Sequence, residues 1–180
     1  IKASFFTLLR THRIKRQDVL GVGVGVPGAI DPKTQVILKS PNLPSWQGIF
    51  LKTILKQKLN LPVSVENDAN AAALGEFYFG SGKRIHNFIY ITVSTGIGSG
   101  IVANGQLLCG EKGTAGEVGH MTLVRDGNKC PCGKRGCLEA YSSGTAIANY
   151  VKHALKKGAR SNFFRDVNVG KITGQLVAEA

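Results

Sequence analysis

The sequence predicts an α/β protein, because segments patterned as buried strands alternate along the chain with segments patterned as helices. Residues 19–26 largely alternate valine with glycine, which is typical of a buried strand whose backbone packs closely against its neighbours. Residues 50–59 fit a helix, and the apolar side chains of residues 71–77 suit another. The sequence contains no internal repeat and no low-complexity linker, so we expect the same architecture throughout.

Further elements are expected in the first half of the chain. Apolar side chains in helical register predict a helix over residues 2–13, and the valine–glycine strand should end in a turn at residues 27–31. Residues 62–66 predict a second strand. Either Asn67 or Asp68 can cap the helix that follows, because short polar side chains accept hydrogen bonds from the free N–H groups of a first helical turn.

The second half of the chain continues the same alternation. We expect a strand over residues 88–93, a glycine-rich turn over 94–100 and a returning strand over 101–103. Asn-Gly at 104–105 is a favoured hairpin turn, since both residues tolerate positive φ. The pattern of residues 138–155 predicts one long helix.

Composition places the chain among globular proteins. Its 180 residues, 43% of them hydrophobic, suffice for one sizeable core or two small ones. No apolar run approaches the roughly 20 residues of a membrane-spanning helix, and the N-terminus has no signal-peptide pattern. Clustered cysteines more often bind metal than form disulfides in a reducing compartment. We therefore expect a cytoplasmic protein without a membrane partner.

The chain carries a net charge of +12, from 23 Lys and Arg against 11 Asp and Glu. Such an excess suits an acidic partner such as a nucleic acid or a nucleotide phosphate. However, the basic residues are scattered, and the denser groups within residues 10–16 and 152–160 lie in helix-like segments without interleaved aromatic residues. We therefore interpret most of this charge as solvated helix faces.

The most specific chemical signal is a zinc-ligand pattern. Cys130, Cys132 and Cys137 follow His120, and three thiolates with one imidazole form a closed tetrahedral ligand set. Free buried thiols and disulfides are the alternatives, but the close spacing and the Pro and Gly residues between the cysteines favour zinc.

Two carboxylates accompany the predicted zinc loop. Glu117 lies three residues before His120, and Glu139 lies two residues after the last cysteine. A purely structural zinc does not need these neighbours, whereas a polar binding pocket does.

Two other motifs have both a chemical and a structural interpretation. Asp68 follows a strand, at the sheet edge where α/β proteins bind ligands, and it can act there as a general base or simply cap a helix. The turn over residues 95–100 can expose backbone N–H groups to a phosphate, but hairpins also use glycine. This turn matches neither a Walker loop nor a Rossmann fingerprint.

A series of segments, in this order, resembles the ROK family of bacterial sugar kinases, including glucokinases, and sugar-responsive repressors. The resemblance extends from about residue 19 to about residue 150. The segments are Pro-Gly-Ala-Ile-Asp (27–31), Ser-Pro-Asn-Leu (40–43), Glu-Asn-Asp-Ala-Asn-Ala-Ala-Ala-Leu-Gly-Glu (66–76), Thr-Gly-Ile-Gly (95–98), Gly-Glu-Val-Gly-His (116–120) and Cys-Pro-Cys-Gly-Lys-Arg-Gly-Cys-Leu-Glu (130–139).

The resemblance implies an actin/hexokinase-like (ribonuclease H-like) fold, with two lobes and a sugar in the cleft. Residues 1–83 would belong to the small N-terminal lobe and residues 84–180 to the larger lobe with the zinc loop, with 80–84 as the boundary. We expect the chain to be an incomplete piece of that fold. No Asp-x-Gly-Gly-Thr phosphate loop precedes residue 20, and no adenosine-binding segment or winged helix-turn-helix is recognisable.

The resemblance also implies the roles of individual residues. Asp68 would be the catalytic base, and zinc would be structural, fixing the direction of His120 through one ring nitrogen while the other meets the sugar. The implied sugar-binding residues are Gly28, Asn42, Asn67, Asp68, Glu117, His120 and Glu139; the residues at the ATP phosphates are Thr95, Gly96 and Gly98; the zinc ligands are His120, Cys130, Cys132 and Cys137.

The implied function is transfer of a phosphoryl group from Mg-ATP to a hexose or N-acetylhexosamine. The alternative is a repressor whose kinase-like domain senses a sugar, and only that alternative implies a nucleic-acid partner. Ser94 and Ser99 stand where the family often has glycine, which affects nucleotide binding more than sugar binding. We also expect a homodimer or a higher homo-oligomer.

Overall fold

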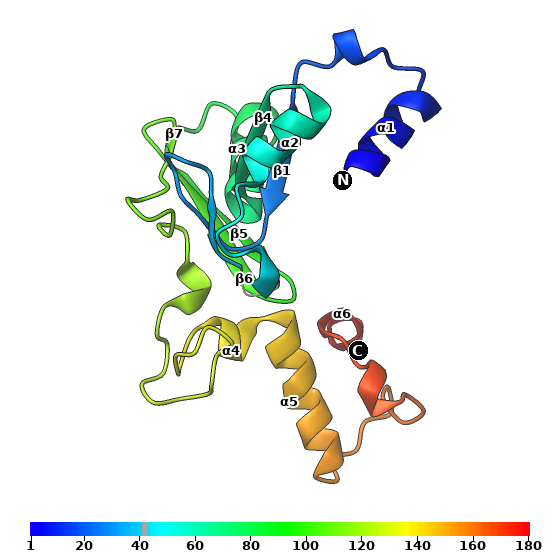
Figure 1. The fold of residues 1–180 in the computed structure, drawn as a ribbon. Coiled ribbons are helices and arrows are strands. Elements are labelled where there is room, and N and C mark those ends of the chain that lie inside the picture. Colours follow the sequence, from blue (N-terminus) through cyan, green and yellow to red (C-terminus); the bar gives the residue numbers. More distant parts are fainter. Residues whose placement is uncertain (41–42) are drawn as a thin grey trace. The chain divides into compact units, whose positions relative to one another are not determined.

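A computed structural model describes residues 1–40 and 43–180 and divides the chain into two compact units (Figure 1). The first unit contains Ile1–Phe88 and Gly100–Ala115, and the second contains Ile89–Ser99 and Gly116–Ala180. Each unit is described below by itself. The predicted division of the chain into lobes at residue 83 stays a prediction.

A parallel pair of strands forms the centre of the first unit. β1 (Val22–Val26) pairs with β4 (Val63–Asn67), with Val26 opposite Asn67, so both strands end at the same edge. α2 (Leu51–Leu59) packs on β4, and α3 (Asp68–Phe79) contacts both strands (Figure 1). The buried core lies between these elements and comprises Val26, Ile30, Ile37, Leu51, Leu55, Leu59, Val63 and Val65.

The predicted elements of the first unit are confirmed with shifted ends. The first helix, α1, covers Lys2–Thr11, and β1 begins at Val22, where its pairing with β4 begins. The predicted turn after β1 contains a two-residue strand, β2, which pairs antiparallel with β3. The remaining elements are η1 (Arg16–Asp18), β2 (Ala29–Ile30), β3 (Ile37–Lys39) and η2 (Pro44–Trp46).

A three-stranded sheet has the order β5-β6-β7, and residues of β5 and β6 belong to both units. β5 covers Phe88–Val93 as predicted, and β7 covers Gln106–Leu107. Asn104 and Gly105 have φ angles of 51° and 73°, which confirms the predicted hairpin turn. β6 covers Ile97–Ala103, so the predicted return over 101–103 was too short and the turn before it is narrower.

The single helix predicted over residues 138–155 was wrong, because Ser143 divides it. α4 (Glu139–Ser142) ends at Ser143, whose backbone is extended. The Ser143 hydroxyl then accepts a hydrogen bond from the Ala146 N–H at 3.1 Å and so caps α5 (Gly144–Lys156). The other short helices of the second unit are η3 (Val118–His120), η4 (Val169–Lys171) and α6 (Gly174–Ala178).

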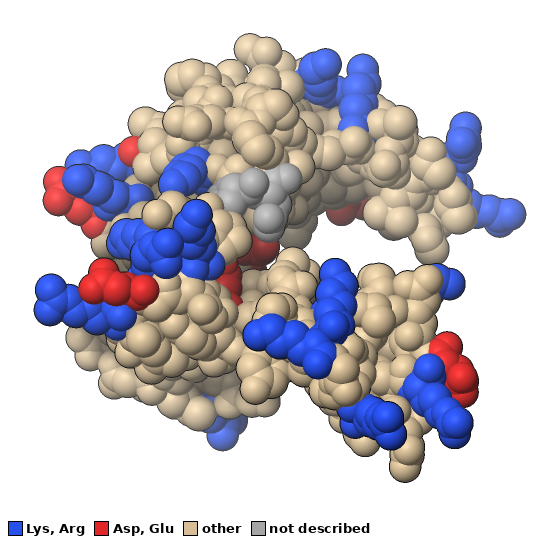
Figure 2. All heavy atoms as spheres, turned by 90° about the horizontal axis from the view of Figure 1, so that it is seen from below, with Lys and Arg blue, Asp and Glu red and all other residues tan. Residues whose placement is uncertain are grey.

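The structure also shows where basic side chains lie and how apolar the described helices are. On the face shown in Figure 2, Lys and Arg side chains stand in small groups. Among the described helices, none combines the length and apolar character that crossing a membrane requires.

The core position of Leu55 gives a stability prediction. Leu55 is 3% exposed, so Leu55→Ala should lower the free energy of unfolding by about 2–5 kcal/mol, through lost burial and the cavity that remains. Gln57→Ala, on the exposed face of the same helix, should change it by no more than about 0.5 kcal/mol. Denaturant unfolding of both variants measures the difference, and equal effects would contradict this assignment of the core.

Candidate functional site

Gly28, Asn67 and Asp68 meet at the carboxyl edge of the β1–β4 pair, within the first unit. Gly28 has a φ of 112°, and an added Cβ would overlap the carbonyl oxygen of Lys39, so only glycine fits there. The Asn67 side chain donates from Nδ2 to the Gly28 carbonyl oxygen at 3.0 Å. This bond joins the ends of the two strands, where ligands of α/β proteins usually bind.

Asn67, and not Asp68, caps α3. Its Oδ1 accepts hydrogen bonds from the N–H groups of Ala69 at 2.9 Å and Asn70 at 3.0 Å. Asp68 is the first residue of the helix; its side chain is exposed and accepts only from the adjacent Ala69 N–H among the described residues. The carboxylate of Asp68 is therefore free to meet a ligand, while Asn67 retains one N–H to donate.

Two residues that the sequence analysis did not assign hold this edge in place. Glu66 Oε1 accepts from the Asn67 backbone N–H at 2.9 Å and from Asn70 Nδ2 at 3.0 Å, and Asn70 is buried. Both residues lie in the segment 66–76, but their contacts depend on the angle at which α3 leaves β4.

In the second unit, the four predicted zinc ligands converge. The ligand atoms of His120, Cys130, Cys132 and Cys137 all lie within 4.8 Å of one another. The Cys132 and Cys137 sulfurs are 3.7 Å apart, and Cys130 Sγ is 3.6 Å from His120 Nδ1. In a tetrahedron with Zn–S bonds of about 2.3 Å and a Zn–N bond of about 2.0 Å, these edges measure about 3.8 and 3.5 Å.

This geometry fits zinc and does not fit a disulfide. A separation of 3.7 Å is far longer than a covalent S–S bond of about 2.05 Å. The site therefore has the donor set, the spacing and the burial of a structural zinc centre, in which zinc would hold the loop and the histidine in place.

A tight hairpin positions the cysteines. The Cys130 N–H donates to the Lys134 carbonyl oxygen at 2.9 Å, and Lys129 and Arg135 form an antiparallel bridge. Gly133 and Gly136 have φ angles of 96° and 78°, which other residues adopt only with strain. The turn between the ligands thus depends on the glycines that the sequence supplies.

The protonation of the cysteines shows why this cluster suits a cation. Burial raises the pKa of Cys130 to about 12 and also raises the pKa of Cys137. Burial alone would raise the pKa of Cys132 too, but hydrogen bonds from the Lys134 backbone N–H and the neighbouring thiols lower it below its ordinary value. Three thiolates therefore need a bound cation to coexist here.

Two glycines bring His120 to this cluster. An added Cβ on Gly116 would overlap the Ser99 carbonyl oxygen, and one on Gly119 would overlap that of Ile97, so the segment lies directly against β6. The Ser99 hydroxyl also donates to the Gly116 carbonyl oxygen at 2.7 Å.

The second ring nitrogen of His120 faces Glu117. His120 Nε2 lies 3.6 Å from Glu117 Oε2, while Nδ1 lies 3.6 Å from Cys130 Sγ on the side of the other predicted ligands. A carboxylate beside the free nitrogen of a metal-binding histidine fixes the direction of the ring. Glu117 and His120 thus present a polar pair beside the predicted zinc.

The predicted phosphate residues lie in the same unit. Thr95 is exposed and Gly96 half-buried in the turn before β6, whereas Gly98 lies within the strand. Glu139 accepts a hydrogen bond from the Ile97 N–H at 2.8 Å, which brings its carboxylate to this turn.

The sugar-site prediction draws on both units, and the joining of its halves stays a prediction. The first half consists of Gly28, Asn67 and Asp68, and the second of Glu117, His120 and Glu139. Asn42, also predicted to line the sugar site, lies outside the described residues.

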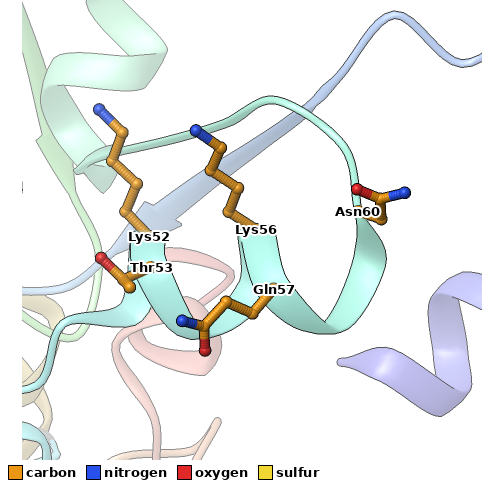
Figure 3. A pocket seen from close by; sticks show the side chains of 5 residues that line it. All are labelled: Lys52, Thr53, Lys56, Gln57 and Asn60. Atoms are coloured by element: carbon orange, nitrogen blue, oxygen red, sulfur yellow. The ribbon is translucent and has the colours of Figure 1, made fainter.

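A hollow of about 500 Å³ lies elsewhere, along α2 (Figure 3). Lys52 and Lys56 extend from the same side of the helix. None of the predicted site residues lines this hollow, whose lining is Lys52, Thr53, Lys56, Gln57 and Asn60.

Comparison with known proteins agrees with the motifs. A profile of the ROK family matches residues 3–180. The chain belongs to the ROK family. The resemblance stated from the sequence is thereby confirmed.

ROK proteins of two kinds are similar to this chain. A xylose repressor of Caldicellulosiruptor bescii is 41% identical over 164 residues, covering 91% of this chain and 41% of the repressor. A glucokinase of Halalkalibacterium halodurans is 42% identical over 174 residues, covering 96% of this chain and 52% of the enzyme. The chain thus spans about half the length of these relatives.

A solved structure confirms the predicted fold class. A ROK family glucokinase from Streptomyces griseus, in complex with glucose and AMPPNP, superimposes with a TM-score of 0.80 at 40% identity. The match covers 91% of this chain and 53% of that one. The chain therefore has the α/β, actin/hexokinase-like fold of ROK proteins over the part that it spans.

The cluster of predicted zinc ligands gives a prediction about metal content. Cys137→Ser should abolish stoichiometric zinc and loosen the loop, because metal binding and loop folding are coupled. Cys109→Ser, which changes a free thiol outside the cluster, should keep the zinc. Elemental analysis of both purified variants tests this, and a wild-type protein without zinc would refute it.

The same cluster gives a prediction about the pH dependence of zinc binding. Because burial raises the pKa of Cys130 to about 12, zinc must displace its proton at neutral pH. Zinc affinity should therefore rise with pH and fall in acid, as a competition assay with a chelator would show.

Proposed function

We propose that the whole protein is a sugar kinase that transfers the γ-phosphoryl group of Mg-ATP to a hydroxyl of a hexose or N-acetylhexosamine. The observation that carries this proposal is the exposed carboxylate of Asp68 at the carboxyl edge of β1 and β4. Because Asn67 performs the capping of α3, Asp68 is available for chemistry. The glucokinase relative and the glucose-bound structure support the same activity.

In the proposed reaction, Asp68 accepts the proton of the sugar hydroxyl as its oxygen bonds to the γ-phosphorus. The bond from that phosphorus to the bridging oxygen of ADP breaks, so the products are a sugar phosphate and ADP. Mg²⁺ would neutralise charge on the phosphates. Catalysis of this kind consists mainly of positioning and electrostatic stabilisation.

The proposed sugar site uses groups with complementary hydrogen-bonding capacity. Carboxylates of Glu117 and Glu139 can accept from hydroxyls, and a zinc ion bound to His120 would fix the direction of its second nitrogen, which lies 3.6 Å from Glu117 Oε2. Asn67 can donate its remaining N–H, beside Gly28. Such a set suits a polyhydroxylated ring more than an apolar ligand.

The turn before β6 is the proposed phosphate contact of the second unit. Thr95 is exposed there, and Gly96 is half-buried. Gly98, which lies within β6, would be a third residue of the proposed phosphate contact. The phosphate loop and adenosine site of a complete kinase would lie outside these 180 residues.

A sugar-responsive repressor is the second candidate, favoured by the 41% identity to a xylose repressor. A sensor needs the sugar-binding residues and the zinc loop but no phosphoryl transfer. Ser99 does not separate the two candidates. Its hydroxyl is buried and donates to the Gly116 carbonyl oxygen, which is a contact within the protein. Cytoplasmic location and homo-oligomer formation remain predictions for both.

Asp68→Asn tests the catalytic role in the full-length protein. The amide cannot accept the proton, so turnover should fall by about 10²- to 10⁴-fold while sugar affinity is largely kept. Coupled measurement of ADP release across a panel of hexoses and N-acetylhexosamines decides it. Wild-type turnover in the variant would mean that Asp68 is not the base.

If the wild-type protein binds sugar but consumes no ATP with any sugar in the panel, the kinase proposal fails. A mobility-shift assay with operator DNA, with and without sugar, would then decide in favour of the repressor or against both.

Glu117→Ala tests the sugar site. Loss of a charged acceptor should weaken sugar binding by about 10- to 100-fold in calorimetry. Glu111→Ala, which removes an exposed carboxylate from the chain, is the matched control and should leave the affinity unchanged. Zinc content is measured in parallel, and unchanged affinity in Glu117→Ala with zinc retained would reject the assignment.

A further inference from the structure

The carboxylate of Glu139 links the end of the zinc loop to the turn before β6. Oε2 accepts from the Ile97 N–H at 2.8 Å, and Oε1 lies 3.8 Å from Cys130 Sγ. Glu139 is half-buried and follows the last zinc ligand, Cys137, by two residues. Forty-two positions separate the bonded residues along the chain, so tertiary structure alone creates this contact.

The segment 139–144 holds this turn at both ends. Besides the bond to Ile97, the Gly144 N–H donates to the Ser94 carbonyl oxygen at 2.8 Å. Within the turn, the Ser94 N–H donates to the Gly96 carbonyl oxygen at 2.9 Å. Thr95 thus lies in a turn whose two ends are fixed by one segment of the chain.

At Gly96 the Glu139 carboxylate, rather than the backbone conformation, occupies the space that a side chain would need. Its φ is not in the left-handed region, so the backbone would accept alanine. An added Cβ would instead overlap Glu139 Oε2 and lie 3.2 Å from Cδ. Since that obstacle is the end of a flexible side chain, alanine at this position would displace the carboxylate rather than unfold the turn.

We propose that Glu139 is a positioning residue for the phosphate turn, in addition to its place in the proposed sugar site. It would act as a hydrogen-bond acceptor that fixes the Ile97 N–H and thereby the backbone of Thr95 and Gly96. This inference rests on the proposed kinase function for its nucleotide ligand. A residue that only bound sugar would have no effect on nucleotide binding when sugar is absent.

The test measures the affinity of the full-length protein for a non-hydrolysable ATP analogue without sugar. Glu139→Ala removes the acceptor and should weaken this affinity by about 3- to 10-fold. Glu139→Gln keeps an acceptor oxygen, so its nucleotide affinity should stay within about 2-fold of wild type while sugar binding weakens. Asp166→Asn, which removes an exposed charge from the same unit, is the control and should leave both affinities unchanged.

Gly96→Ala provides an independent arm, because it leaves Glu139 in the chain but displaces its carboxylate. It should weaken nucleotide binding as Glu139→Ala does. Combined with Glu139→Ala, it should add little, since the two changes remove the same contact. Additive effects would contradict the proposed link.

Hydrogen exchange of the peptide containing residues 94–97 separates the failure of this proposal from the failure of the kinase function. Faster exchange in Glu139→Ala and Gly96→Ala, with zinc content retained, supports the link. Unchanged exchange and unchanged nucleotide affinity overturn it. If exchange quickens but no form binds nucleotide, the role in phosphate positioning is overturned together with the kinase function.

Discussion

The close approach of residues 116–120 to the backbone of β6 is the constraint on which the second unit depends. Gly116 and Gly119 face carbonyl oxygens of that strand with no room for a side chain. Residues 116–120 can therefore lie directly against β6, which places His120 beside the three cysteines. A larger residue at either position would lift the segment from the strand, and the ligand set, the direction of the histidine and the position of Glu117 would be lost together.

Local patterns predicted the elements that depend on local interactions. β5 has the predicted bounds, and α3 begins directly after the strand as its polar cap indicated. The divided helix at Ser143 and the early start of β6 were missed for a common reason. Ser-Gly sequences suit a cap, a turn or a strand, and only the partner groups in the folded chain decide among them.

In the candidate site too, the sequence could predict which residue types come together, but not the contacts that depend on the folded structure. Cysteine and histidine spacing was enough to predict that these four side chains converge, and the structure brings their ligand atoms within 4.8 Å of one another. The choice of capping residue between Asn67 and Asp68 was open, because either side chain can reach the first N–H groups of α3. The hydrogen bond from the Ile97 N–H to Glu139 could not be predicted from the sequence, because it depends on the paths of two backbone segments that are far apart along the chain.

A xylose repressor and a glucokinase are similar to this chain at nearly the same identity, 41% and 42%, so the chain's overall similarity does not separate the two proposed functions. Glu139 would connect the proposed sugar site with the proposed phosphate turn: it is a proposed sugar ligand, and its carboxylate accepts from the Ile97 N–H beside that turn. A group shared by two binding sites makes their affinities interdependent, and the effect is equal in both directions. In a kinase, such a link would let sugar binding order the phosphate turn. In a sensor, the same link would transmit sugar binding to β6 without any chemistry. On the proposed roles, one carboxylate would therefore serve either function with the same contact to the Ile97 N–H.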